Sequence, residues 1–500
     1  MLVNAVLKGV LRPLLAGAGL FALAMPLAYA EDLMAIYQAA QANDPKFRSA
    51  RQQQQVTGQQ ARQQRAGYLP QLNLELQVIE TDQTVISSDN TVFQQGNANY
   101  GTDDLSLTLS QAVFRWDRIE AWKQSRVQED QADARALQAG QDLQLRVAEA
   151  YFGALAARDA VILSKAELAS STRQFEDADA RYRRGLARRT DQLDAQARMA
   201  QVEAELMAKQ NAWEDALEGL RELTGSTPES LKPVARELQL AAPDPLPVDS
   251  WVKAAADGNI ELQIQRMTVD IADREVERQR AGHYPTLDLR FKHNERTTDG
   301  SLFGGGSETE SDEITLALNL PLYSGGSVWA KRKEAASRFE QSKDELERTR
   351  REVERQTRAA YQGILSSIRR AKALEQAVKA QELAVETKRR GFQAGLYTSM
   401  TVLDAEEDLY ADRYQFALAR YDYLNNWIKL RRATGQLKQD DLAALNGQLV
   451  SLEEEARVDV PLSTPAEQAQ VQAPEAAPAP SPATAPAPVP AAKPAKAPAR

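Results

Sequence analysis

The stretch RAGYLPQLNLELQV, residues 65–78, contains the residues that decide the fold. It reads as the end of a helix, then Pro70, then a strand with an apolar residue at every second position. The stretch RAGHYPTLDLRFKH, residues 280–293, repeats this order around Pro285. Because proline cannot continue a helix, Pro70 and Pro285 are predicted to mark joints at which a helix ends and a strand begins.

Four short segments share this alternation of apolar and polar residues. The pattern predicts strands with one lipid-facing and one water-facing side, as in membrane barrels. A soluble antiparallel sheet with one wet face shows the same alternation, and this alternative stays open. Polar loops join the segments in pairs, and the chain contains no other apolar element to cover them. The apolar positions are Leu72, Leu74, Leu76, Val78, Leu105, Leu107, Leu109, Leu287, Leu289, Phe291, Ile314, Leu316, Leu318 and Leu320.

The helical parts of the chain repeat at a constant offset. Three features recur 210 residues later: Ala-Tyr at 150–151, the glycine at 185, and the Thr-Gly pair at 224–225. An offset that stays constant over this span indicates an internal duplication, and the period is too long for a solenoid. The chain is therefore predicted to fold as two structural halves.

Each half is predicted to contain the same order of elements. Proline is missing between Pro70 and Pro228 and between Pro321 and Pro461, as expected of long helices. The longest helical stretch, of about 66 residues, would span about 100 Å. Two shorter helices stacked end to end match this length, which favours a cylinder of antiparallel helices. In the first half, the predicted elements are a helix at 33–66, strands from 68 and at 105–114 around a polar loop at 82–103, and helices at 119–184 and 191–223. In the second half, they are a helix at 249–281, strands at 286–292 and 313–323, and helices at 328–394 and 401–433.

The two ends of the chain differ from its middle. A positive start and an apolar run that ends in Ala-Tyr-Ala at 28–30 predict a cleaved export signal. Proline and alanine dominate from Pro461 onward, so the tail is predicted to be disordered or polyproline-like. The expected organisation is a signal peptide at 1–30, a first repeat at 31–225, a linker at 226–248, a second repeat at 249–435, an equatorial segment at 436–460 and a tail at 461–500.

Composition excludes several classes of function. The 500 residues carry a net charge of −9, which argues against nucleic acid as a partner. The chain has no cysteine, so neither a disulfide nor a lipid-modified N-terminal cysteine is expected. His283 and His293 are the only histidines, which argues against a structural zinc site, and His293 is expected in an exposed loop. No catalytic or phosphate-binding motif indicates an enzyme or a cofactor.

Four strands cannot close a barrel in lipid, because each unpaired backbone group in hydrocarbon costs several kcal/mol. Barrels made from a single chain begin at about eight strands. Three copies of this chain would supply ~12 strands, which enclose a water-filled lumen. The sequence therefore predicts a homotrimer whose leucine faces contact lipid.

The twofold repeat, the RAGYLP and RAGHYP joints and the paired glycine turns resemble the TolC family of outer-membrane channel proteins, in its non-lipidated branch. The resemblance implies an α+β membrane protein: a homotrimeric 12-stranded β-barrel with four strands per chain, continued by a long antiparallel α-helical barrel in the periplasm. It also implies an exit duct for drugs or proteins, in multidrug efflux or type I secretion. The partners would be a periplasmic adaptor (membrane fusion protein) and an inner-membrane ABC or resistance-nodulation-division transporter. The alternative is a soluble periplasmic coiled-coil scaffold or adaptor.

By the same resemblance, the periplasmic mouth lies at the two glycine turns. Thr190 and Asp191 keep residue types that close the mouth in the family, and Asp404 keeps one of two acidic ring positions. Three copies of Asp404 around a pore would attract cations. Phe392, Tyr397 and Thr401 replace a tyrosine, an arginine and an acidic residue of the family. The family's closing contacts therefore cannot all form here, and two alternatives stay open: a looser mouth, or other links from Arg188 and Arg189.

Two further sets of residues follow from the resemblance and the joints. The turn residues Gly185, Leu186, Gly395 and Leu396 are expected to dock adaptor helices, and Pro321 is expected to mark an outgoing joint whose first-half place is held by Ala112. Taken without the resemblance, the aspartates 191, 194 and 404 are ordinary helix-capping residues, and that interpretation stays open.

Overall fold

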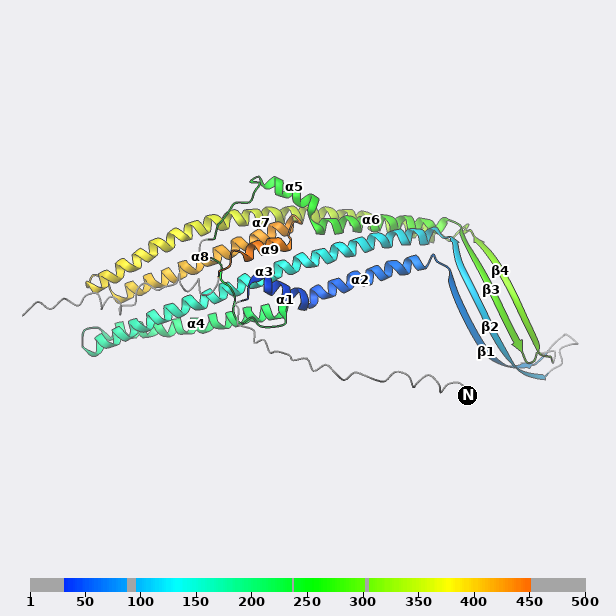
Figure 1. Ribbon diagram of the computed structural model, residues 1–500, viewed down its shortest axis with the longest axis horizontal. Coiled ribbons are helices and arrows are strands. Elements are labelled where there is room, and N and C mark those ends of the chain that lie inside the picture. Colours follow the sequence, from blue (N-terminus) through cyan, green and yellow to red (C-terminus); the bar gives the residue numbers. More distant parts are fainter. Residues whose placement is uncertain (1–30, 88–95, 236–237, 302–304, 451–500) are drawn as a thin grey trace, which may run out of the picture. The chain divides into compact units, whose positions relative to one another are not determined.

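The computed structural model describes residues 31–87, 96–235, 238–301 and 305–450 (Figure 1). The predicted signal peptide, the tail and residues 451–460 of the preceding segment lie outside the described residues. The first half contains α1 (Leu33–Asn43), α2 (Pro45–Ala66), β1 (Gln71–Val85), β2 (Gly96–Phe114), α3 (Trp116–Arg183) and α4 (Arg189–Thr224). The second half contains α5 (Val248–Gly258), α6 (Ile260–Arg280), the 3-10 turn η1 (Ala281–His283), β3 (Thr286–Thr298), β4 (Ser307–Asn319), α7 (Ser327–Gln393) and α8 (Ser399–Ala433), and the unpredicted helix α9 (Gln439–Asn446) follows it.

Two long helices organise the described residues. Helix α3 has 68 residues and α7 has 67, so each spans about 100 Å. Helix α4 lies along one part of α3 and α2 along the other, and α8 and α6 flank α7 in the same way (Figure 1). Among the described helices, none combines the length and the apolar character needed to cross a membrane.

The hydrophobic core lies where the two halves meet midway along these helices. It contains fully buried residues of α1, α3 and α8, among them Ile36, Tyr151 and Ile428. The ring of Phe152 stacks on Tyr421 with 6.1 Å between centroids. Full burial of one such side chain contributes about 1.5–3 kcal/mol, so this cluster joins the halves.

The opening helix of the first half is broken, contrary to the single helix predicted at 33–66. Asp44 adopts an extended backbone, and its carboxylate accepts a hydrogen bond from the Phe47 amide at 2.9 Å, which starts a new helix at Pro45. Pro45 has no amide hydrogen to continue α1. The Arg146 guanidinium of α3 donates to the Asp44 carboxylate at 2.7 Å, which fixes the break against the long helix.

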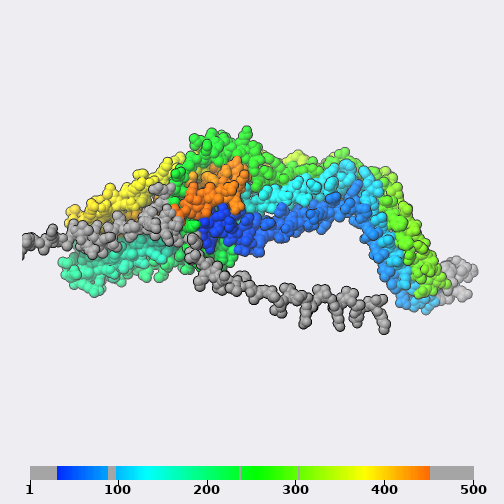
Figure 2. Space-filling view, in the orientation of Figure 1, coloured from blue at the N-terminus to red at the C-terminus, as the bar shows by residue number. Residues whose placement is uncertain are grey.

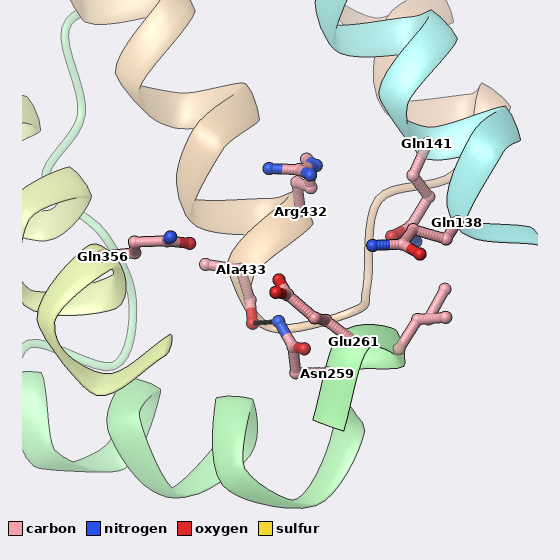
Figure 3. A pocket seen from close by; sticks show the side chains of 8 residues that line it. Gln138, Gln141, Asn259, Glu261, Gln356, Arg432 and Ala433 are labelled. Carbon is pink, nitrogen blue, oxygen red and sulfur yellow. Dashed lines mark hydrogen bonds between the residues drawn. The ribbon is translucent and has the colours of Figure 1, made fainter. Parts of the chain in front are cut away.

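The second half has the equivalent break at Asn259, 215 residues after Asp44, so the single helix predicted at 249–281 is also wrong. The Asn259 side chain accepts from the Leu262 amide and donates to the Ala433 carbonyl at 2.8 Å (Figure 3). A β-carbon on Gly258 would collide with the Thr434 carbonyl, so the close approach of α5 and α8 requires glycine there. The opening helices are thus docked at matching points in both halves.

The four strands form one antiparallel sheet in the order β1-β2-β3-β4. The strands are longer than predicted, although β4 ends at Asn319 and not at residue 323. Most of the expected loop at 82–103 is paired strand, with Asp82 opposite Asn99 and Val85 opposite Gly96. Pairing continues because the bonds join backbone groups, whatever the side chains are. For the same reason His293 lies within β3, opposite Asp312, and the prediction of a loop there was wrong.

Candidate functional site: the apolar sheet face and the helix turns

The apolar face of the sheet is uncovered in a single protomer. Leu74 on β1 is 69% exposed, and Ile314 and Leu316 on β4 are 75% and 63% exposed. Figure 2 shows the sheet projecting beyond the helices. A soluble monomer would bury this face against its own fold, so its exposure indicates a contact outside the protomer.

The apolar band crosses the sheet obliquely. It covers Leu72–Val78 on β1 and Ile314–Leu320 on β4 and the residue directly after it. The hydrogen-bonded row through Glu75, the middle of the first range, meets β4 at Ser311, whereas the middle of the second range is Ala317. The band therefore shifts by about two residues per strand, a slant of about 50° given about 3.3 Å per residue and 4.8 Å between strands. Strands that cross a membrane at a tilt of about 45° require this kind of slant.

Both edges of the described sheet are open. Strand β1 pairs only with β2, and β4 pairs only with β3. These edge strands have 15 and 13 residues. Such long edges are templates for pairing with another chain, and in hydrocarbon they must be paired.

The predicted joints lie at the helix–strand boundaries. Pro70 comes directly before β1 and Pro285 directly before β3. Pro321 follows the end of β4, whereas Ala112 still lies inside β2, because alanine keeps the amide hydrogen that a strand uses. Beside these joints the ring of Trp116 packs edge-on against Tyr284 at 6.3 Å, a position at which membrane barrels carry aromatic girdles.

The two turns at the far end of the helices are built alike. Gly185 and Gly395 have positive φ values of 73° and 77°, which glycine adopts without strain. The amide of Leu186 donates to the Arg181 carbonyl, and that of Leu396 to the Gly391 carbonyl, at 2.9 and 2.8 Å. This closing pattern leaves both leucines more than 70% exposed, so each turn presents one apolar side chain to solvent.

The polar residues expected at the mouth make mostly local contacts within the protomer. The Asp191 carboxylate accepts from the Arg188 amide at 3.3 Å, and Thr190 donates to Asp191 at 3.4 Å. The hydroxyls of Thr398 and Thr401 lie 2.9 Å apart at the start of α8. Asp404 is exposed and has no partner within the described part of the protomer. Asp191 and Thr401 therefore act as capping-region residues here, and Asp404 does not.

Two of the three replaced residues, Phe392 and Tyr397, make contacts near the second turn. The guanidinium of Arg181, from the first-half turn, lies 4.8 Å from the centre of the Phe392 ring. A cation over an aromatic face contributes about 0.5–1 kcal/mol at exposed sites. The Tyr397 ring lies over Gly391, where a β-carbon would collide with it. The structure thus brings α3 and α7 together at the mouth through Arg181 and Phe392.

Sequence reasoning missed a buried acid close to these turns. Glu406 of α8 is only 5% exposed; it accepts a hydrogen bond from the hydroxyl of Ser170 of α3 and pairs with Arg389 of α7 at 2.5 Å. The Arg389 side chain is half exposed, so the burial lies on the Glu406 side of the pair. The signal was present in the sequence, because Glu406 follows Val402 by four residues and precedes Leu409 by three, on one helix face.

A second ion-pair group involves Glu407, the neighbour of Glu406, and joins α4 to α3 and α8. Arg198 of α4 contacts Glu167 of α3 at 3.3 Å and also pairs with Glu407 of α8. Burial, opposed by Arg198 and assisted by Glu407, raises the pKa of Glu167. The first-half pair α3–α4 and the second-half pair α7–α8 are therefore fastened to each other within one protomer.

Comparison with known proteins identifies the family. The sequence profile described as "Outer membrane efflux protein" matches residues 36–226 and again residues 251–436. The chain belongs to the outer membrane efflux protein family. It is 31% identical over 436 residues to the alkaline protease secretion protein AprF of Pseudomonas aeruginosa, which covers 86% of this chain and 90% of that protein. It is 31% identical over 447 residues to the outer membrane protein TolC of Vibrio cholerae, which covers 88% and 98%. Among solved structures, the outer membrane protein VceC of Vibrio cholerae matches with a TM-score of 0.68 at 21% identity, covering 81% of this chain and 96% of that one.

Membership of the outer membrane efflux protein family confirms several predictions. The predicted TolC-type family is correct, and so is the α+β membrane fold with four strands per chain, long antiparallel helices and a twofold repeat. The family consists of transport proteins of the outer membrane, so the chain is not an enzyme. The domain limits, the signal cleavage and the roles of the mouth residues remain predictions.

Proposed function

We propose that three copies of this chain close a 12-stranded barrel in the outer membrane and form an exit duct that continues through the periplasm. The observation that carries this proposal is the exposed, slanted apolar band on a sheet with two open edges. A trimer pairs both edges and turns every leucine face toward lipid. A single four-stranded sheet leaves both edges unpaired, so more than one copy is required in lipid.

The partners follow from the turns and from the relatives. Leu186 and Leu396 offer two equivalent apolar contacts for the helical tip of a periplasmic adaptor, which would join the duct to an inner-membrane ABC or resistance-nodulation-division transporter. The relative AprF is named for secretion of a protease, which supports type I protein secretion by this chain. Multidrug efflux is the second candidate, and the family description supports it.

At the mouth, Asp404 is the residue available to face the pore. It is exposed, and no group in the described part of its own protomer neutralises it. Three copies around the axis would form a ring of negative charge that binds multivalent cations. Opening would move the three protomers apart at the mouth. Within each protomer, Arg181, Phe392 and the Glu406 group would keep the two helix pairs together.

Engineered cysteines test the trimer, because the natural chain has none. Continuing the shift of about two residues per strand across the open edge predicts Ala317 opposite Gln77 of the next copy. Paired residues lie about 4.5–5.5 Å apart, within disulfide range. A chain with Ala317→Cys and Gln77→Cys should therefore oxidise to a covalent trimer.

The matched control is Ala317→Cys with Thr81→Cys, whose α-carbon would lie about 13 Å farther along the strand. It should give little covalent product. If neither cysteine pair cross-links and the protein is monomeric in buffer without detergent, then β4 of one copy does not meet β1 of the next. The proposed duct would then be wrong.

A further inference from the structure

A group of metal-ligating side chains lies on β3 and β4, outside every site described above. His293 and Glu295 are two residues apart on β3, and their cross-strand partners are Asp312 and Glu310. All four project from the face that carries Phe291; His293 and Asp312 lie one row beyond the apolar band, and Glu295 and Glu310 lie two rows beyond it. We refer to these four residues as the hairpin cluster: His293, Glu295, Glu310 and Asp312.

The geometry of the hairpin cluster assigns different roles to its members. The Nδ1 atom of His293 lies 2.8 Å from the Asp312 carboxylate, and Nε2 lies 3.3 Å from the Glu295 carboxylate. Ligand atoms of His293, Glu295 and Glu310 all lie within 4.8 Å of one another. When Nδ1–H donates to a carboxylate, Nε2 carries the free lone pair, which is the arrangement that metal-binding histidines adopt.

Within the hairpin cluster, His293 contacts the carboxylates of Asp312 and Glu295, and three carboxylates share this one imidazole. Glu295 stands directly opposite Glu310, and like charges in this relation destabilise a sheet. Glu310 has no partner among the described residues. The nearby basic residues Lys292 and Arg296 alternate onto the other face of β3, where they cannot reach between the two carboxylates. A cation between the strands would remove this repulsion.

We propose that His293, Glu295 and Glu310 bind one divalent transition-metal ion, with Asp312 as the positioning residue for the imidazole. One imidazole nitrogen and two carboxylates form a three-ligand set that suits Zn²⁺ and leaves a position for water. The histidine and cysteine counts predicted no structural zinc site; the proposal departs from that prediction because carboxylates would supply the remaining ligands. The ion would join β3 to β4 beyond the lipid-facing band, whatever the subunit number.

The test uses the full chain in detergent, freed of metal with a chelator and titrated with Zn²⁺ by calorimetry. One Zn²⁺ per chain is expected. Both His293→Ala and the isosteric Glu310→Gln should weaken binding at least tenfold. The matched control is His283→Ala, which removes the other histidine of the chain and should leave the affinity unchanged.

Two further measurements separate the proposal from simple charge attraction. Asp312→Asn should weaken binding by about 10–100-fold, as expected for loss of a carboxylate behind a histidine ligand. Co²⁺ should give a visible absorption band that disappears in His293→Ala. Equal affinity in the His293 and His283 variants, no saturable binding, or full competition by Mg²⁺ at equal concentration would each overturn the assignment.

Discussion

Leu74→Arg tests whether the leucine face contacts lipid. Leu74 lies near the middle of the apolar band on β1, opposite Leu107, and is 69% exposed in one protomer. An arginine at the midplane of a membrane barrel costs about 2–4 kcal/mol. Since 1.4 kcal/mol corresponds to a factor of ten in an equilibrium constant, the folding equilibrium constant of the variant should fall about 30–1000-fold per chain. A trimer carries the change three times.

The measurement is the free energy of unfolding of the protein in lipid vesicles, with heat dissociation of the trimer on gels as a second readout. The control is Glu75→Arg, one residue along the strand and on the opposite face, beside Ser106. This residue faces water in the proposed barrel, so its change should cost less than 1 kcal/mol. Equal damage from the two variants would show that the two faces are not lipid and water.

Two further predictions concern the mouth and the equator. Asp404→Ala should weaken the block of reconstituted channels by trivalent cations, while Asp194→Ala, an exposed aspartate of α4, should not; unchanged block in the first variant removes the ring. Burial alone would raise the pKa of Asp44, but hydrogen bonds from Arg146 and from the Phe47 amide lower it below its usual value. The stability that the Asp44 carboxylate contributes to the fold is therefore complete above about pH 4 and is lost as the pH falls through the lowered pKa. Asp44→Asn keeps a helix cap but should cost about 1.5–3 kcal/mol in urea unfolding at pH 7, and the difference from the natural chain should shrink in acid; a constant difference would contradict this.

Part of the site was readable from the sequence and part was not. The joints at Pro70 and Pro285 and the turns at Gly185 and Gly395 follow from local backbone chemistry, and the structure places them at the predicted ends of elements. The strand ends were misjudged, because polar residues at 82–85 and 96–103 continue to pair through their backbones. Glu406 was missed, because its partners Ser170 and Arg389 are distant in sequence.

The sequence by itself determined the twofold repeat, the alternating faces of the four strands and the proline-free long helices, because each of these can be read along the chain without knowing which segments pair. Only the tertiary structure decided the register. Register depends on pairing between strands almost 190 residues apart, such as Ser106 with Asn294. That pairing produces the slant of the apolar band and places His293 beside two glutamates, and neither feature is visible along a single strand.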